Sequence, residues 1–137
     1  MENISHVAIA VRDLEAQIAI YRDVLGLELV SLEQVDDQGV KAAMFQCGQV
    51  RIELLEPLGD DTPVGRFIEK RGEGIHHIAY RVQDLEGTLG ELSERGLRLI
   101  DTAPRPGAHG AQIAFVHPKS TGGVLTEFCQ EEPPPSA

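Results

Sequence analysis

The chain has 137 residues, 42% of them hydrophobic, which fits one domain of ordinary size. Its 22 acidic and 12 basic side chains give a formal net charge of -10, which argues against nonspecific binding to nucleic acid or to an anionic membrane. No charged-then-apolar leader opens the sequence, and no apolar run approaches the roughly 18 residues that a membrane-spanning helix needs. We therefore expect a cytoplasmic protein, in which an anionic ligand would need a local cation.

The first half of the chain predicts a strand, a helix and three further strands. The expected strands are at 4–11, 27–35, 40–47 and 49–56, where β-branched and alternating residues are separated by glycine-containing turns. Asp13 is placed to cap the helix, and Gly26 to end it. The apolar stripe of this helix consists of Leu14, Ile18, Tyr21 and Leu25.

The second half predicts the same order after a loop from Pro57 to Pro63 and a short helix over 64–71. Asp84 is placed to cap the second long helix. The strands are expected at 75–82, 97–101, 111–116 and 124–130. Residues 131–137, with three consecutive prolines, are expected to form a loose tail.

The two halves also repeat in sequence. HVAIAVRDLE, which starts at His6, returns as HIAYRVQDLE, which starts at His77, an offset of 71 residues; Glu53 returns as Glu127 at an offset of 74. Either half alone would bury too small a core. We therefore predict one domain over residues 1–130. Its parts are module one (3–56), a linker (57–74) and module two (75–130), followed by the tail 131–137.

Strand alternation indicates where the two histidines point. His6 shares a face with Ala8 and Ala10, and this face leaves room for a ligand, whereas the bulkier face should pack under the helix. By the same alternation His76 falls on the opposite face from His77, which favours His77 as the functional histidine.

Glu53 and Glu127 lie inside otherwise apolar strands, where an unpaired carboxylate is strongly unfavourable. Taken singly, His6 or His77 fits a structural role. Taken together with the two glutamates, they have the composition of a divalent metal site.

Other polar residues leave alternatives open. Cys47 and Cys129 fit buried, reduced thiols on strands. Arg51 either pairs with Glu53 or lies outside the site. His109 and His117 lie in turns, where they either form local hydrogen bonds or contact the substrate. Lys119 and Ser120 also lie in a turn, where they are either solvated or bind a carboxylate or CoA phosphate.

Paired modules with this His, Glu, His, Glu order resemble the vicinal oxygen chelate (glyoxalase-like) superfamily. The resemblance implies an α+β fold, in which two β-α-β-β-β modules form a cupped, eight-stranded mixed sheet around a divalent metal. Within the superfamily, several segments are most similar to the methylmalonyl-CoA epimerase family: GIHHIA from Gly74, AHG from Ala108, FVHPK from Phe115 and GGVLTE from Gly122.

The resemblance implies that His6, Glu53, His77 and Glu127 bind the metal, with glutamine replacing the first glutamate in some members. Co²⁺ is favoured, and Mn²⁺, Zn²⁺ and Ni²⁺ suit the same donors. It further implies a homodimer that interconverts (2R)- and (2S)-methylmalonyl-CoA. The proton at C2 is removed and returned through a metal-stabilised enolate, with Glu127 as the catalytic base.

One position departs from the family. A characterised member has a second catalytic glutamate on its third strand, where this chain has Ala42. A water, or a displaced carboxylate such as Glu33 or Glu56, would have to replace it.

Three other functions remain possible within the same fold. A lactoylglutathione lyase uses the same ligand order, but segment 108–127 is less similar to it. A ligand-sequestering module of the bleomycin-resistance type needs no catalytic metal, so an intact four-ligand set argues against it. A ring-cleaving dioxygenase uses two histidines and one carboxylate, which the additional Glu53 disfavours.

Overall fold

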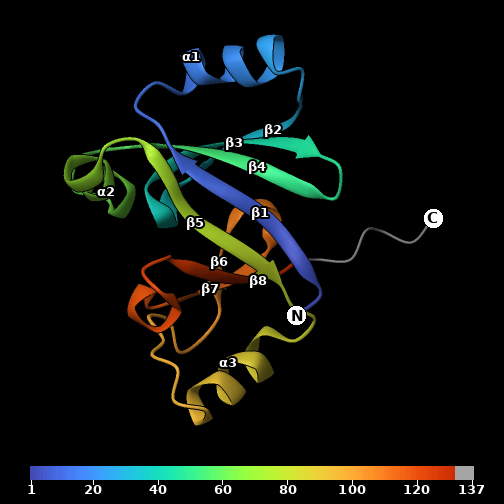
Figure 1. Cartoon of the computed structure of the whole chain (residues 1–137), viewed down its shortest axis with the longest axis vertical. Coiled ribbons are helices and arrows are strands. Elements are labelled where there is room, and N and C mark those ends of the chain that lie inside the picture. Colours follow the sequence, from blue (N-terminus) through green and yellow to red (C-terminus); the bar gives the residue numbers. More distant parts are fainter. Residues whose placement is uncertain (132–137) are drawn as a thin grey trace.

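The computed structural model describes residues 1–131. Eight strands form one mixed sheet in the order β2-β3-β4-β1-β5-β8-β7-β6, which curls into a cup (Figure 1). The strands are β1 (Asn3–Ala10), β2 (Glu28–Val35), β3 (Val40–Cys47), β4 (Val50–Pro57), β5 (Gly74–Arg81), β6 (Arg105–Pro106), β7 (Gln112–Val116) and β8 (Thr126–Gln130). The helices are α1 (Leu14–Ala19), α2 (Pro63–Arg71) and α3 (Leu85–Glu94). This architecture confirms the expected fold of two similar modules.

The pairing of the strands repeats between the modules. β1 pairs in parallel with β4, and β5 pairs in parallel with β8, while β1 and β5 run antiparallel at the centre of the sheet. The four central strands therefore come equally from both modules, and residues on them can meet across the module boundary.

The helices begin where the sequence predicts. Asp13 Oδ1 accepts a hydrogen bond from Ala16 N at 3.1 Å, and Asp84 Oδ1 accepts one from Gly87 N at 3.1 Å. A π turn over Ile20–Val24 follows α1, and its wider winding turns Leu25 outward, so that this residue is 58% exposed. The prediction that Leu25 belongs to the buried apolar stripe of this helix was therefore wrong.

The predicted strand at 97–101 was also wrong. Here Leu99 forms only an isolated bridge to Val116, and the edge strand next to β7 is the two-residue β6. The reason is a side chain: Asp101 Oδ2, rather than a backbone carbonyl, accepts the hydrogen bond from Phe115 N. The backbone ladder cannot continue past that point.

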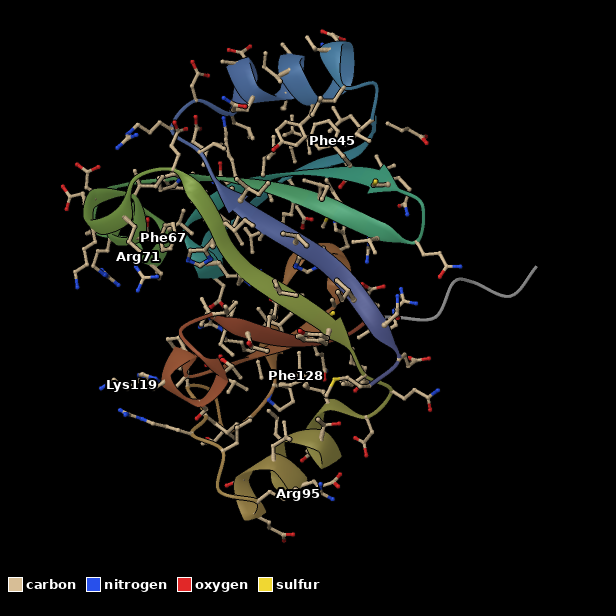
Figure 2. All side chains as sticks on the ribbon, in the orientation of Figure 1. Phe45, Phe67, Arg71, Arg95, Lys119 and Phe128 are labelled. Atoms are coloured by element: carbon tan, nitrogen blue, oxygen red, sulfur yellow. The ribbon has the colours of Figure 1, made fainter. Side chains whose placement is uncertain are left out.

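The convex face of the sheet carries the two apolar cores. Phe45 packs under α1 with Leu14 and Ile18, and Phe128 packs under α3 with Leu89 (Figure 2). Ile9 joins the first of these clusters, as the alternation predicts.

The concave face is only partly open. Ala8 and Ala10 were expected to leave room for a ligand, but Val64 and Ile68 of α2 pack against them and fill that space. The open part of the cup lies further along, beside His6. Among residues 1–131, no helix combines the length and apolar character needed to cross a bilayer.

Candidate metal centre

Four buried side chains from the four central strands meet on the concave face. His6 Nε2 lies 3.0 Å from Glu127 Oε2 and 3.6 Å from Glu53 Oε1. His77 Nε2 lies 3.5 Å and 4.0 Å from the same two oxygens. Their exposed fractions are between 2% and 8%. All four residues predicted from the repeat are thus brought together.

Three of these residues present ligand atoms within the reach of one ion. The ligand atoms of His6, His77 and Glu127 all lie within 4.8 Å of one another, and Glu53 adds a fourth donor next to the two imidazoles. Two imidazoles with two carboxylates suit a borderline divalent metal. The donor set therefore fits a metal of this class.

Two buried atoms of the cluster support this fit. Within residues 1–131, neither His77 Nε2 nor Glu127 Oε2 makes a hydrogen bond of good geometry, although Glu127 Oε2 lies 3.0 Å from His6 Nε2 and 3.5 Å from His77 Nε2. Each such atom costs about 1–3 kcal/mol when it is left unpaired. A cation between them would satisfy both.

The electrostatics of the site also favour positive charge. Burial alone would raise the pKa of Glu127, but the neighbouring His77 and His6 lower it to about 2. Burial alone would lower the pKa of His6, but Glu53 and Glu127 raise it above its ordinary value. The carboxylate of Glu127 therefore stays charged and attracts a cation.

A cavity of about 170 Å³ opens beside the cluster. His6, Glu53 and Glu127 form one wall. The other lining residues include Met44, Ile113, Arg51, His109, Cys129 and Glu131.

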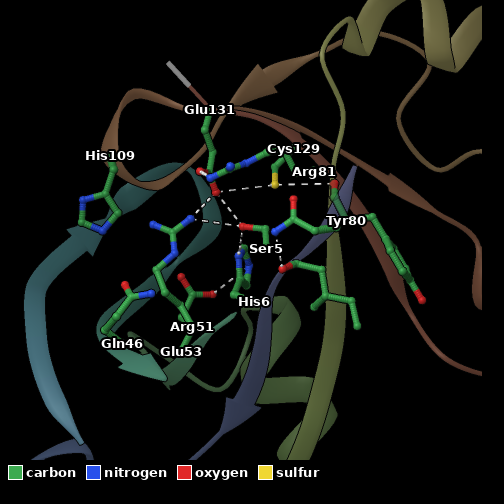
Figure 3. A network of polar contacts seen from close by, with 12 residues as sticks. Ser5, His6, Gln46, Arg51, Glu53, Tyr80, Arg81, His109, Cys129 and Glu131 are labelled. Carbon is green, nitrogen blue, oxygen red and sulfur yellow. Dashed lines mark hydrogen bonds and ion pairs between the residues drawn. The ribbon is translucent and has the colours of Figure 1, made fainter. Parts of the chain in front are cut away.

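Arg51 does not pair with Glu53. Its guanidinium donates to Ser5 Oγ at 3.2 Å and to Glu131 (Figure 3). Glu131 also accepts from Arg81 and Ser5, so the expectation that the loose tail begins at this residue was wrong. The rest of the predicted tail, 132–137, lies outside the described residues.

The structure separates the two displaced carboxylates. Ala42 is buried in the apolar cluster beneath α2, and Glu33 is its direct cross-strand partner on β2, so both lie on the concave face. Glu33 Oε2 accepts a hydrogen bond from His109 N at 3.1 Å. Glu56 instead accepts from Leu14 N at the start of α1, which lies on the convex face.

The turn residues differ in their roles. His117 Nδ1 accepts from Lys119 N, which is the local hydrogen bond expected in a turn. Ser120 Oγ accepts from Arg98 N, so it joins this turn to the segment after α3. His109 departs from this pattern: its Nε2 lies 2.9 Å from Ser31 Oγ, and its Nδ1 lies 3.4 Å from Glu33 Oε2. It thus joins the loop after β6 to β2, across the cavity.

The prediction that His76 falls on the opposite face of its strand from His77 was wrong. In the pairing of β1 with β5, Ala8 opposes His77 and Ile9 opposes Ile75, so His76 is the extra residue of a β-bulge. Its Nδ1 lies 2.8 Å from the Nδ1 of His77. Alternation alone gives no signal of a bulge, and so the sequence missed this contact.

The two cysteines occupy different environments. Cys129 is a buried, free thiol in β8, as expected, and burial raises the pKa of this thiol to about 12. Cys47 was also expected to be buried, but it is exposed, because it ends β3 just before the turn to β4.

Comparisons with known proteins agree with this geometry. Residues 5–115 match the family of the glyoxalase/bleomycin resistance protein/dioxygenase superfamily. The chain is 43% identical to the ethylmalonyl-CoA/methylmalonyl-CoA epimerase of Cereibacter sphaeroides, over 93% of this chain and 96% of that protein.

Solved structures of epimerases are also similar to this chain. A methylmalonyl-CoA epimerase in complex with methylmalonyl-CoA and NH4+ superposes with a TM-score of 0.94 at 36% identity, over 100% of this chain and 99% of that one. The methylmalonyl-CoA epimerase of Mycobacterium tuberculosis gives 0.92 at 39% identity, over 96% and 89%. The chain therefore belongs to the glyoxalase/bleomycin resistance protein/dioxygenase superfamily and, within it, to the methylmalonyl-CoA epimerases, a family of isomerases.

Proposed function

We propose that the chain interconverts (2R)- and (2S)-methylmalonyl-CoA, with His6, Glu53, His77 and Glu127 holding one divalent metal. The observation that carries the proposal is the convergence of these four buried side chains beside a cavity of about 170 Å³, in a chain 43% identical to an epimerase of this class. Co²⁺ is the metal we favour, with Mn²⁺, Zn²⁺ and Ni²⁺ compatible with the same donors.

Glu127 is the proposed base. A bound cation would act as a Lewis acid that stabilises the negative charge developing on the thioester oxygen as C2 loses its proton. The neighbouring His77 and His6 lower the pKa of Glu127, so its carboxylate is ionised and can accept a proton. A carboxylate removes the C2 proton only if that proton has been made more acidic, which a cation beside the thioester oxygen would do.

The second face of the substrate needs a separate proton donor, because inversion requires the proton to return opposite to where it left. Ala42 cannot donate one. We propose that Glu33 takes this role, because it shares the face of Ala42 and contacts His109 in the cavity wall. A water held near His109 would carry the proton the remaining distance.

The test follows deuterium uptake and configuration together. The metal-loaded protein is incubated with (2S)-methylmalonyl-CoA in deuterated water, and label at C2 and the 2R product are measured over time. We expect both to appear. Label uptake without any 2R product would contradict epimerisation, and turnover of a glutathione hemithioacetal in place of methylmalonyl-CoA would favour a lactoylglutathione lyase.

A further inference from the structure

The residue before each candidate histidine ligand occupies the same unusual position. In the antiparallel pairing of β1 with β5, Ile4 opposes Tyr80 and His6 opposes Ala79, which leaves Ser5 as an extra residue. His76 is the extra residue of the corresponding bulge before His77. A β-bulge re-aims a side chain, and here each one places a polar group beside the Nδ1 atom of the next residue.

The hydrogen bonds around Ser5 fix the direction of its proton. Ser5 Oγ donates to Glu131 Oε1 at 2.6 Å, and a hydroxyl has one proton to give (Figure 3). Glu131 is ionised: burial alone would raise its pKa, but the hydrogen bond from Ser5 and the guanidinium groups of Arg81 and Arg51 lower it. Ser5 can therefore only accept from His6 Nδ1, which lies 3.1 Å away.

This polarity determines the tautomer of His6. When Nδ1 carries the proton that Ser5 accepts, the lone pair of Nε2 is free, and Nε2 is the atom that points at Glu53 and Glu127. Ser5 is 2% exposed, so water does not compete for the contact.

His76 provides the same arrangement in the second module. Its Nδ1 lies 2.8 Å from His77 Nδ1, so one of the two nitrogens must donate and the other accept. The Nε2 of His77 is the atom turned toward Glu127. If that atom is to bind a metal, His77 donates from Nδ1 and His76 accepts. Phe67 packs edge-to-face against the ring of His76 and holds it in place.

We propose that Ser5 and His76 are positioning residues that set the tautomer and orientation of the two histidine ligands, and that Glu131 fixes the direction of the hydrogen-bond chain through Ser5. The proposal rests on the metal site of the proposed function. Metal-bound histidines commonly donate their other ring N–H to such a neighbouring acceptor, which fixes the tautomer and the orientation of the ring.

The test uses Zn²⁺ alone, bound to the full chain and measured by competition with a chromophoric chelator. Removing the hydrogen-bond acceptor of a metal-bound histidine commonly costs roughly 10–100-fold in metal affinity, so Ser5→Ala and His76→Phe should each weaken Zn²⁺ binding by about this factor. His76→Phe keeps a ring against Phe67 and removes only the nitrogen acceptor. Glu131→Gln keeps an oxygen that accepts from Ser5 and should bind Zn²⁺ nearly as well as the parent, whereas Glu131→Ala should not.

A second readout separates positioning from stability. In the Zn²⁺-loaded protein labelled with ¹⁵N-histidine, the Nδ1 proton of His6 should exchange slowly with water, and it should exchange much faster in Ser5→Ala. Asp84→Ala is the matched control, because it removes the capping carboxylate at the start of α3, which packs on the convex face of the sheet. It should lower the melting temperature and change neither the Zn²⁺ affinity nor the exchange of this proton.

The outcomes are distinguishable. A parent protein that binds no Zn²⁺ would overturn the metal site and the positioning role together. A parent that binds one Zn²⁺, with Ser5→Ala and His76→Phe binding it equally well, would overturn only the positioning role. If Ser5→Ala fails to fold, the contrast between Glu131→Gln and Glu131→Ala decides the first half of the proposal, and His76→Phe decides the second.

Discussion

Glu53 and Glu127 hold equivalent places in the two modules but differ in their distances to the histidines. Glu127 Oε2 lies within 3.5 Å of both Nε2 atoms, whereas Glu53 Oε1 lies 3.6 Å and 4.0 Å from them. We predict that Glu127→Gln lowers the rate of C2 proton exchange by roughly 10²–10⁴-fold, because it removes a proton-transferring group. Glu53→Gln should lose much less, because it loses only a charge at one donor.

The measurement is deuterium uptake at C2, together with the metal content of each purified variant. Both variants should fold. Equal losses of exchange, with metal content unchanged in both, would contradict the division of roles between the two glutamates.

The proton donor for the second face is tested at Glu33. We predict that Glu33→Gln slows formation of the 2R product more than it slows deuterium uptake, because one face of the substrate still exchanges. Glu28→Gln on the same strand is the matched control, since Glu28 is exposed and no role is proposed for it. If Glu33→Gln slows both processes equally, or neither, Glu33 is not the donor.

Ala42 offers a complementary gain of function. In the Glu33→Gln background, Ala42→Glu should restore inversion with the metal content unchanged, because it places a carboxylate on the same face one strand closer to the metal centre. Ala42 is 3% exposed among apolar side chains, so the new carboxylate should also lower stability. Unchanged metal content without restored inversion would contradict the idea that a carboxylate on this face is the proton donor.

At the scale of the elements, the same kind of hydrogen bond joins α1 to β4 in module one and α3 to β8 in module two. Glu56 Oε1 accepts from Leu14 N at 3.0 Å, and Gln130 Oε1 accepts from Leu85 N at 2.9 Å. We predict that Glu56→Ala destabilises the fold by about 1 kcal/mol in chemical denaturation, the usual loss of a cap, with C2 exchange unchanged. Glu56→Gln should be nearly neutral, since it keeps the acceptor. A loss of exchange in Glu56→Ala would return Glu56 to the candidates for the second acid.

Local signals explain which elements could be predicted from the sequence. The caps at Asp13 and Asp84 and the helix α2 depend on neighbouring residues, and all three are found in the structure. The strand expected at 97–101 fails because Asp101 is drawn to Phe115, a contact made only in the folded chain. The space expected at Ala8 is filled because α2 folds back over it.

The residues of the candidate site also divide into those that the sequence pattern identifies and those that depend on contacts in the folded chain. The internal repeat was enough to find the four side chains that converge, because the same residue types recur at matching strand positions. Ser5, His76 and Glu131 could not be found this way. The first two depend on bulges between β1 and β5, and Glu131 depends on arginines from β4 and β5.

At the scale of the whole molecule, the sheet leaves β2 as a long outer strand. Val30 and Leu32 on this strand are 45% and 62% exposed, and an outer strand with apolar residues favours pairing with another chain. We predict a homodimer at micromolar concentration in sedimentation experiments. Leu32→Lys should shift it toward the monomer, and Lys41→Arg serves as a control that keeps the charge on the neighbouring strand. A parent that sediments as a monomer would contradict the prediction.

The metal would also join the two modules, because His6 and Glu53 come from module one and His77 and Glu127 from module two. A ligand that binds only the folded state adds about 2.7 kcal/mol of stability at 100 times its Kd, which corresponds to roughly 10 °C in Tm for a chain of this size. We therefore predict that a chelator lowers the Tm of the purified protein by about this amount, and that added Zn²⁺ restores it.

The variant His6→Ala provides the control for this metal-dependent stabilisation. It lacks one ligand from module one, so its Tm should respond much less to the chelator or to Zn²⁺, even if its own stability differs from that of the parent. The comparison is thus the response to metal within each protein, which cancels the effect of the substitution on the core. If the parent and His6→Ala respond equally, the ion binds elsewhere, and the convergence of the four central strands serves packing rather than metal binding.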